Sequence, residues 1–337
     1  MVQIKKKTRF WLFISIFILG SFLAVFFFKT GFTINRVIGW DDENKILSSD
    51  DLPKLPDKDP NRINVLLLGM RGLEENGEGQ LLSDALIILS VKKATGKVAL
   101  MSIPRDIYLR IWCAQEKKKI NFAYAYGGFD CAKKTASYLS GLYIDYAISA
   151  NFGAFKEIVD ALGGISLYLD KPFEEDFQWA KEGQIDDEHW LIKEFDGEER
   201  WVFCLPQGEN ILDGETTLYY VRSRYSTDDF DRMYRQQQVL LAIKEKALSL
   251  GVLANPVKIY NLLDILGKNV RTDMNLTDIG NLINLASDLD IENIKRKVFD
   301  INSEGLLYHT FINEEYVLLP VGDNFKQIQE VCQNIFN

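Results

Sequence analysis

Histidine is nearly absent from this chain, since only His189 and His309 occur among its 337 residues. The two lie far apart, and neither has neighbouring cysteines or carboxylates at the spacing of a metal-binding motif. Zinc sites in proteins are built from cysteine, histidine and carboxylate ligands in such spacings. The sequence therefore predicts no zinc centre and leaves little scope for histidine-based catalysis.

Runs of basic residues are also scarce. Outside the N-terminal segment they are no longer than three residues, as in Lys117-Lys118-Lys119, and the formal net charge of the chain is -9. Nucleic-acid-binding domains usually concentrate lysine and arginine on one face to neutralise phosphates. We therefore expect no nucleic-acid partner. Hydrophobic residues make up 47% of the chain, which is enough for a large core.

One long uncharged apolar run is present, at residues 10–28, and it follows Lys5, Lys6, Lys7 and Arg9. A helix needs about 20 apolar residues to span a bilayer, and a basic flank keeps its end in the cytoplasm. We expect a cytoplasmic tail at residues 1–9 and a single-pass anchor in the cell membrane at residues 10–28. A cleaved signal peptide is the alternative, but residues 29–32 offer no small-residue cleavage site.

The segment after the apolar run is polar and acidic and contains Pro53, Pro56 and Pro60. Such a composition favours a semi-extended linker over a compact fold. We expect an extracytoplasmic stalk at residues 29–61. No internal repeat and no second linker follow, so residues 62–337 are predicted to form one extracytoplasmic domain.

Outside the cytoplasm, cysteines can form disulfides. The chain has four, which allow three complete pairings. We favour Cys113 with Cys131, which flank the segment that holds Asn121. Cys204 and Cys332 complete the set. The alternative is that all four remain separate buried thiols.

Apolar runs at residues 63–68, 85–91 and 98–103 are typical of strands buried on both faces. Residues 144–150 and 165–169 bracket a helical stretch, 154–162, which ends at Gly163-Gly164. Strand, helix and strand in this order predict an α/β layered domain with a mostly parallel or mixed central sheet. In such sheets functional groups collect at the strand ends.

The rest of the chain has weaker patterns. Residues 174–200 are densely charged and are either a solvated insertion or a border of the site. Residues 259–266 and 276–289 are predicted to be helical, and a strand at 316–319 precedes a helix from about residue 324.

Four arginines stand out in this acidic chain because they lie within fourteen residues: Arg222, Arg224, Arg232 and Arg235. If residues 220–224 are extended, Arg222 and Arg224 point the same way and form a clamp. This concentration of cations predicts a bound anion. The alternative is that neighbouring aspartates, Asp228, Asp229 and Asp231, neutralise the arginines internally.

A helix is expected from about residue 231 to 249, with capping residues between Ser226 and Asp229. On it, Arg232, Arg235 and Gln236 share a face because they are three and four residues apart. A bound anion there would accept hydrogen bonds from the arginines and from free amides at the helix start.

Five local motifs follow one another along the chain. They are residues 66–69 with the loop to Asp84; Ser102-Ile103-Pro104-Arg105-Asp106; Lys119-Ile120-Asn121 with residues 123–128; residues 159–164; and Leu212-Asp213-Gly214 before the arginine stretch. Behind a single N-terminal anchor, this ordered set closely resembles the LytR-CpsA-Psr family of bacterial cell-wall glycopolymer transferases. The resemblance covers about residues 62–250 and continues more weakly to the end.

The resemblance implies a three-layer α-β-α core with a hydrophobic tunnel for a prenyl chain. It implies a phosphotransferase that moves a glycopolymer from a polyprenyl-pyrophosphate carrier to a peptidoglycan hydroxyl, through a phosphodiester and with Mg²⁺. Family roles assign pyrophosphate binding to Arg105, Lys119, Asn121, Arg222, Arg224, Arg232, Arg235 and Gln236. They make Asp84 the metal ligand and Asp84, Asp106 and Asp231 the candidate catalytic carboxylates.

Two positions depart from the family pattern. Gly69 is followed by Met70-Arg71-Gly72, without the aspartate that commonly occurs there, and the position two before Asp84 is Leu82 instead of arginine. Two other functions therefore stay open: a non-catalytic binder of a phosphorylated lipid or polymer, and a pyrophosphatase that transfers the phosphoryl group to water.

Overall fold

The computed structural model describes residues 54–70, 81–114, 116–175, 189–195, 197–224, 226–249, 269–286, 289–302 and 305–337. The predicted tail, anchor and most of the stalk lie outside this set, as do Arg71 and the predicted helix at 259–266. In the part of the chain that is described, no helix is both long and apolar enough to cross a membrane.

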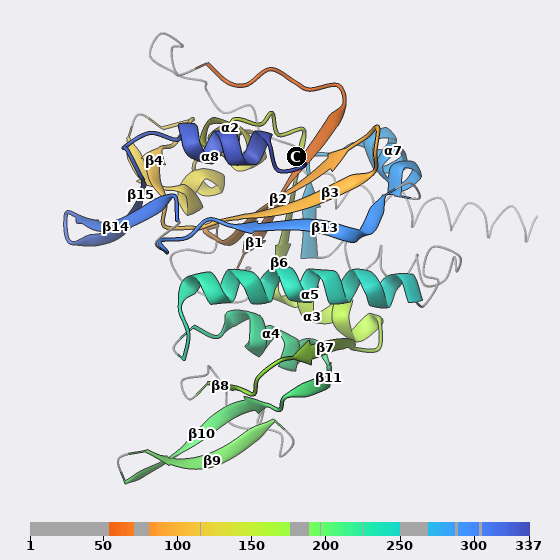
Figure 1. The fold of residues 1–337 in the computed structure, drawn as a ribbon, viewed down its shortest axis with the longest axis vertical. Helices are drawn as coiled ribbons and strands as arrows, with labels where there is room; N and C mark the ends of the chain where they lie inside the picture. Colours follow the sequence, from red (N-terminus) through yellow and green to blue (C-terminus); the bar gives the residue numbers. More distant parts are fainter. Residues whose placement is uncertain are drawn as a thin grey trace, which may run out of the picture.

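A six-stranded sheet forms the centre of the molecule (Figure 1). Its strands, in spatial order, are β12 (Val270–Thr272), β6 (Tyr146–Asn151), β1 (Arg62–Met70), β2 (Ser83–Lys92), β3 (Lys97–Ile103) and β13 (Asp290–Val298). The pairs β1–β6 and β3–β13 are parallel, and the other three are antiparallel. The predicted mixed sheet is confirmed, and three of its strands are the apolar runs identified in the sequence.

Helices lie on both faces of this sheet (Figure 1). On one side are α2 (Ala123–Ser140) and α8 (Lys326–Gln333), and on the other are α3 (Phe152–Ala161), α4 (Gly214–Arg222) and α5 (Asp229–Ser249). A further helix, α7 (Leu276–Ala286), follows β12. Side chains alternate along the strands, so Leu66, Leu86 and Ala147 join the core on the α2 side.

The chain leaves the central sheet after α3. The predicted strand at 165–169 exists as β7 (Ile165–Leu169), but it pairs antiparallel with β11 (Gly208–Leu212). The expectation that it continues the central sheet is therefore wrong. Its residues alternate between buried and exposed, as in a strand with one solvent-exposed face. Gly163 and Gly164, at φ 74° and 81°, turn the chain toward this second ribbon.

The charged stretch at 174–200 contributes strands where it is described. A three-stranded antiparallel sheet has the order β8 (Phe173–Glu175), β10 (Glu198–Leu205) and β9 (Trp190–Phe195). Trp190 and Phe203 are buried in a core that this sheet shares with α4 and α5. The described parts of the stretch are therefore packed structure, which charge density alone did not reveal.

Smaller elements complete the side of the molecule that carries α2. They are β4 (Tyr108–Arg110), β5 (Lys117–Lys119), the 3-10 helix η2 (Ile120–Phe122) and a hairpin of β14 (Leu307–Ile312) and β15 (Glu315–Pro320). The predicted strand at 316–319 is confirmed within β15, and the predicted last helix within α8.

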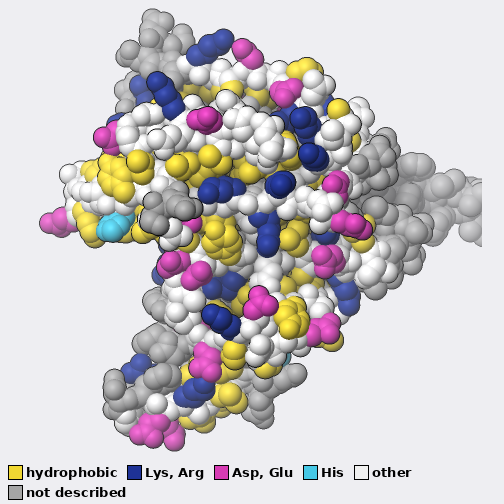
Figure 2. Space-filling model, in the orientation of Figure 1, with side chains coloured by type: hydrophobic (Ala, Val, Ile, Leu, Met, Phe, Trp, Pro, Cys, Tyr) yellow, Lys and Arg dark blue, Asp and Glu magenta, His cyan; other side chains and the backbone are white. Residues whose placement is uncertain are grey.

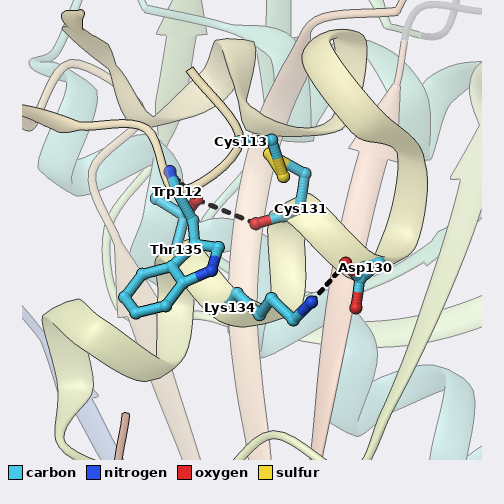
Figure 3. Close-up of a disulfide and its surroundings, with 6 residues drawn as sticks. All are labelled: Trp112, Cys113, Asp130, Cys131, Lys134 and Thr135. Atoms are coloured by element: carbon cyan, nitrogen blue, oxygen red, sulfur yellow. Dashed lines mark hydrogen bonds and ion pairs between the residues drawn. A yellow bond between two sulfur atoms is a disulfide. The ribbon is translucent and has the colours of Figure 1, made fainter. Parts of the chain in front are cut away.

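A disulfide joins Cys113, which follows β4, to Cys131 in α2, with Cα atoms 5.5 Å apart (Figure 3). The favoured pairing is thus confirmed, and Cys204 and Cys332 are free thiols. The backbone amide of Trp112 donates to the hydroxyl of Thr135 at 3.1 Å in the same region (Figure 3). Together these contacts tie the β4–β5 connection to α2.

Candidate functional site

A cavity of about 390 Å³ lies between the central sheet and the helices α3, α4 and α5. On its floor, Leu67 in β1 pairs with Ile87 in β2 and with Ile148 in β6. The three side chains therefore form one row across three neighbouring strands. The helices add further apolar lining residues, among them Phe155, Leu218, Val221 and Leu240. The interior of the cavity accordingly suits a hydrocarbon chain.

One end of the floor is built of small residues. Gly69 pairs with Ala85 on one side and with Ala150 on the other, two positions from the apolar row. A Cβ atom at Gly69 would lie 3.0 Å from the Cβ of Ala85, so a side chain there would crowd its neighbour. This low end of the floor lies where the parallel strands β1 and β6 end, beside the polar residues of the cavity.

Four arginines line the cavity: Arg105, Arg222, Arg224 and Arg232. Arg105 follows β3, Arg222 is the last residue of α4, and Arg232 lies in the first turn of α5. The extended conformation expected for residues 220–224 is wrong, because the chain is helical through Arg222. Arg222 and Arg224 still reach the same cavity, since Ser223 ends the helix with an extended backbone, at φ -53° and ψ 136°. The guanidinium of Arg222 also stacks 4.4 Å from the ring centre of Phe152.

Arg232 is the most buried of these cations, with only 5% of its surface exposed. Its Nη2 donates to Asp229 Oδ2 at 2.8 Å, whereas its Nε is buried and has no hydrogen-bond partner among the described residues. Burial lowers the pKa of Arg232, and Asp229 opposes that shift. A buried donor without an acceptor is unfavourable, so an anion in the cavity would stabilise this arrangement.

Arg105 is surrounded by carboxylates. Its Nη1 lies 2.5 Å from Asp84 Oδ1, and its Nε lies 3.6 Å from Asp106 and 3.8 Å from Asp229. Burial lowers the pKa of Arg105, but the charges of Asp229, Asp84 and Asp106 together outweigh that effect. The net result is a raised pKa. The guanidinium is therefore held at the cavity edge as a permanent cation.

Asp84, the predicted magnesium ligand, lines the cavity. No group of three or more histidine, cysteine or acidic side chains suitable for a metal occurs within the described ranges. Magnesium commonly binds through only one or two carboxylates and completes its six ligands with water and phosphate oxygens. Asp84 fits such an ion when a phosphate is present beside it.

Arg235 does not face the cavity, contrary to the prediction from helix periodicity. Its Nε donates to the carbonyl of Tyr220 at 3.0 Å, its Nη1 to the Thr227 hydroxyl at 2.9 Å, and its Nη2 to the carbonyl of Ser223. Phe173 stacks on it, with 5.0 Å between the guanidinium carbon and the ring centre. The end of α4 lies against this side of α5, so Arg235 joins the two helices, while Arg232 and Gln236 keep the cavity face.

The remaining predicted residues lie beside the cavity or away from it. Lys119 Nζ is 3.0 Å from Asp106 and 3.1 Å from Glu315, and none of the three lines the cavity. Asn121 is buried, and Asp231 is exposed in the first turn of α5. The structure thus does not bring Asp231 to the arginines that line the cavity.

Two polar groups at the cavity were missed as site residues. Asp229 bridges Arg105 and Arg232, although the sequence suggested only a capping or neutralising role for it. Its spacing of three from Arg232 was the available signal. Asn151, which caps α3 by accepting from the Ala154 amide at 2.8 Å, also lines the cavity. Nothing in its local sequence indicated that position.

Comparisons with known proteins agree with this architecture. Residues 22–334 match the model of the LytR_cpsA_psr family. The chain is 30% identical over 257 residues to the polyisoprenyl-teichoic acid–peptidoglycan teichoic acid transferase TagT of Bacillus subtilis, covering 75% of this chain and 72% of TagT. It is 29% identical over 280 residues to the corresponding transferase TagU of Bacillus cereus, covering 80% of each chain.

Solved structures share the fold. The structure of B. subtilis TagV superposes with a TM-score of 0.61 at 24% identity and covers 82% of this chain and 97% of TagV. A structure of TagT bound to LI-WTA gives a TM-score of 0.59 at 24% identity and covers 84% of this chain and 94% of TagT. With the match of the family model over most of its length, this chain belongs to the LytR-CpsA-Psr family.

Proposed function

We propose that this protein transfers a glycopolymer from a polyprenyl-pyrophosphate carrier to a hydroxyl group of peptidoglycan, with formation of a phosphodiester. One observation carries the proposal: a single cavity combines four arginines with an apolar interior. That combination matches a ligand with an anionic headgroup and a long hydrocarbon chain. The relatives TagT and TagU are polyisoprenyl-teichoic acid–peptidoglycan teichoic acid transferases, which supports the same substrate classes.

In the proposed reaction the oxygen of the acceptor hydroxyl attacks the phosphorus that carries the glycan. A new P–O bond forms, and the bond between this phosphorus and the bridging oxygen of the pyrophosphate breaks. Polyprenyl phosphate leaves with the bridging oxygen, and the hydroxyl proton passes to a carboxylate at the cavity. Asp84 is the one of the three predicted catalytic carboxylates that lines the cavity.

The arginines would supply most of the rate enhancement. Phosphoryl transfer spreads negative charge over the transferred and leaving oxygens, so positioned cations stabilise its transition state. Arg232 has a buried donor without an acceptor, and Arg105 is fixed by three carboxylates before any ligand binds. Magnesium, when bound through Asp84, would add positive charge next to the phosphate oxygens.

The predicted anchor at residues 10–28 fits this reaction, because it would keep the domain at the outer surface of the membrane that holds the lipid carrier. In that arrangement the protein is single-pass, with its N-terminus in the cytoplasm. Protease treatment of intact cells tests the orientation: the domain should be digested, and a protected domain would contradict it.

The function is tested with full-length protein in detergent, a polyprenyl-pyrophosphate oligosaccharide, a soluble peptidoglycan fragment and magnesium, with products identified by mass spectrometry. A phosphodiester-linked conjugate together with polyprenyl phosphate is the expected outcome. Free sugar phosphate would instead show a pyrophosphatase, and unchanged lipid bound to the protein would show a non-catalytic binder. Omission of magnesium, with EDTA present, tests the metal requirement separately.

A further inference from the structure

The hairpin β14–β15 carries an exposed aromatic cluster that the donor site does not use. Phe311 pairs directly with Tyr316 across the hairpin, and His309 lies diagonally from Tyr316 on the same face. The rings of His309 and Tyr316 are stacked at 5.9 Å, and those of Phe311 and Tyr316 meet edge to face at 6.0 Å. We call His309, Phe311 and Tyr316 the aromatic face. Phe311 is 64% exposed, so much of its ring is open to a ligand.

The base of the hairpin is fixed beside the arginine site. Leu318 donates its backbone N–H to the carbonyl of Asp106 at 2.9 Å, directly after Arg105 in the chain. Lys119 then bridges Asp106, at 3.0 Å, and Glu315 at the hairpin turn, at 3.1 Å. A continuous series of ion pairs thus runs from Arg105 at the cavity edge to the tip of the hairpin.

Tyr316 lies two residues before Leu318, the residue of β15 that contacts Asp106, and therefore on the same face of the strand. Burial and then the charges of Asp106, Asp229 and Asp228 raise its pKa, and Asp229 is the first residue of α5. In Figure 2 hydrophobic side chains gather over the hairpin, and the outline of the molecule is hollowed beneath it. The aromatic face therefore borders the approach to the site.

The chemistry of the aromatic face favours sugar rings as its partner. One face of a pyranose ring carries mainly C–H groups, which pack on the electron-rich faces of aromatic side chains. Glu314 lies in the turn beside the cluster, whereas Glu315 is the first residue of β15 and is paired with Lys119. A polyanion or an anionic lipid surface would be repelled by the charge of Glu314. A polymer of hexopyranose units with few charges is not repelled.

We propose that the aromatic face of the β14–β15 hairpin binds the glycan chain of the acceptor and presents its hydroxyl group to the arginine site. The inference rests on the proposed transfer reaction, in which donor and acceptor must reach the same phosphorus. The donor lipid occupies the apolar cavity, so the acceptor must approach from outside it, where the hairpin stands.

Binding to soluble, uncrosslinked peptidoglycan glycan strands, measured calorimetrically with full-length protein in nanodiscs and no donor, tests this inference independently of turnover. Phe311→Ser is expected to weaken glycan binding about five- to tenfold and to raise the acceptor KM similarly, while kcat and the donor KM stay unchanged. Tyr168→Ser is the matched control, because Tyr168 is 65% exposed on β7 and lies outside both sites. Equal glycan affinity of Phe311→Ser and wild type would overturn the proposal.

A second variant distinguishes glycan binding by the hairpin from contact of the hairpin with the membrane. The chain has six native tryptophans, so the signal is the difference in indole emission between Phe311→Trp and wild type in nanodiscs. This difference emission is expected to shift when glycan strands are added. Quenching of that emission by brominated lipid chains would show instead that the hairpin contacts the bilayer, which would overturn the proposal. Glycan binding without any conjugate in the transfer assay would refute the proposed reaction but leave the glycan site standing.

Discussion

Asp84 and Arg105 form an ion pair of 2.5 Å at the edge of the apolar cavity, so the predicted metal ligand and a predicted phosphate ligand act on each other. We expect Asp84→Asn and Arg105→Met each to lower kcat/KM by about 10²- to 10³-fold. The loss of kcat/KM in the double variant should be far smaller than the product of the two single losses. Each single substitution already breaks the Asp84–Arg105 ion pair. The exposed pair Lys54 and Asp57 serves as the control cycle. Full additivity at Asp84 and Arg105 would show that they act independently.

Substitutions of Arg235 and Arg232 are expected to have different effects, on stability for Arg235 and on donor binding for Arg232. Arg235→Ala leaves the carbonyls of Tyr220 and Ser223 without their donor, so it should lower the free energy of unfolding by about 2–4 kcal/mol. Arg235→Lys should not restore it, because one ammonium group cannot reproduce the planar fork. Chemical denaturation measures both.

Arg232→Ala removes a cavity donor, so its main effect should be an affinity for the pyrophosphate donor lowered about tenfold or more. Donor binding is measured calorimetrically on protein that still unfolds cooperatively. If Arg235→Ala proved as stable as wild type but inactive, the assignment of Arg235 as a link between α4 and α5 would be wrong.

Ile87 lies at the centre of the apolar floor, between Leu67 on β1 and Ser102 on β3. Ile87→Trp would fill space that a hydrocarbon chain needs, so the affinity for a long-chain donor should fall at least about tenfold. A short-chain pyrophosphate donor should bind nearly as before, because the arginines remain in place. Ile192→Trp, on an exposed position of β9, is the control. Equal losses for both chain lengths would mean that the cavity does not hold the chain.

Arg62 anchors the C-terminal helix to β1 and β2. Its guanidinium donates to the carbonyls of Cys332, at 2.9 Å, and Gln333, at 3.2 Å, and to the Ser90 hydroxyl, at 2.6 Å. A cation at a helix C-terminus also meets the favourable end of the helix dipole. Arg62→Met should lower the free energy of unfolding by about 2–4 kcal/mol with the donor KM unchanged. Lys54→Met, on an exposed lysine, should change stability by less than about 0.5 kcal/mol.

Alkaline pH should weaken the contact between β6 and α7. The Tyr146 hydroxyl donates to Asp278 at 2.8 Å, and burial together with this hydrogen bond raises the pKa of Tyr146 from 10.0 to about 12. Since the folded pKa lies above the unfolded one, the contribution is complete below pH 10 and is lost as the pH rises through about 12. Urea denaturation of wild type and Tyr146→Phe should converge over this range. A constant difference between them would contradict the assignment.

Local patterns in the sequence were sufficient for several elements. The apolar runs at 63–68, 85–91 and 98–103 became β1, β2 and β3, and the paired glycines after α3 end that helix. These predictions succeeded because side-chain periodicity and glycine conformations are properties of a few consecutive residues. The ordered motifs also identified the family before any contact was known, and the cysteine pairing was favoured correctly.

Tertiary structure decided how those elements meet. The strand pattern predicted the segment at 165–169 but not its partner, β11. Helix periodicity placed Arg235 on the same face as Arg232, whereas in the structure Arg235 donates to the carbonyl of Tyr220 in α4. Leu67 and Ile148 are neighbours on the cavity floor because of the register between β1 and β6. No local sequence pattern encodes that register. The sequence alone therefore determined the first three strands, the family and the presence of an arginine cluster. Which arginines line the cavity depends on contacts between residues far apart in the chain, and only the packed structure specifies those.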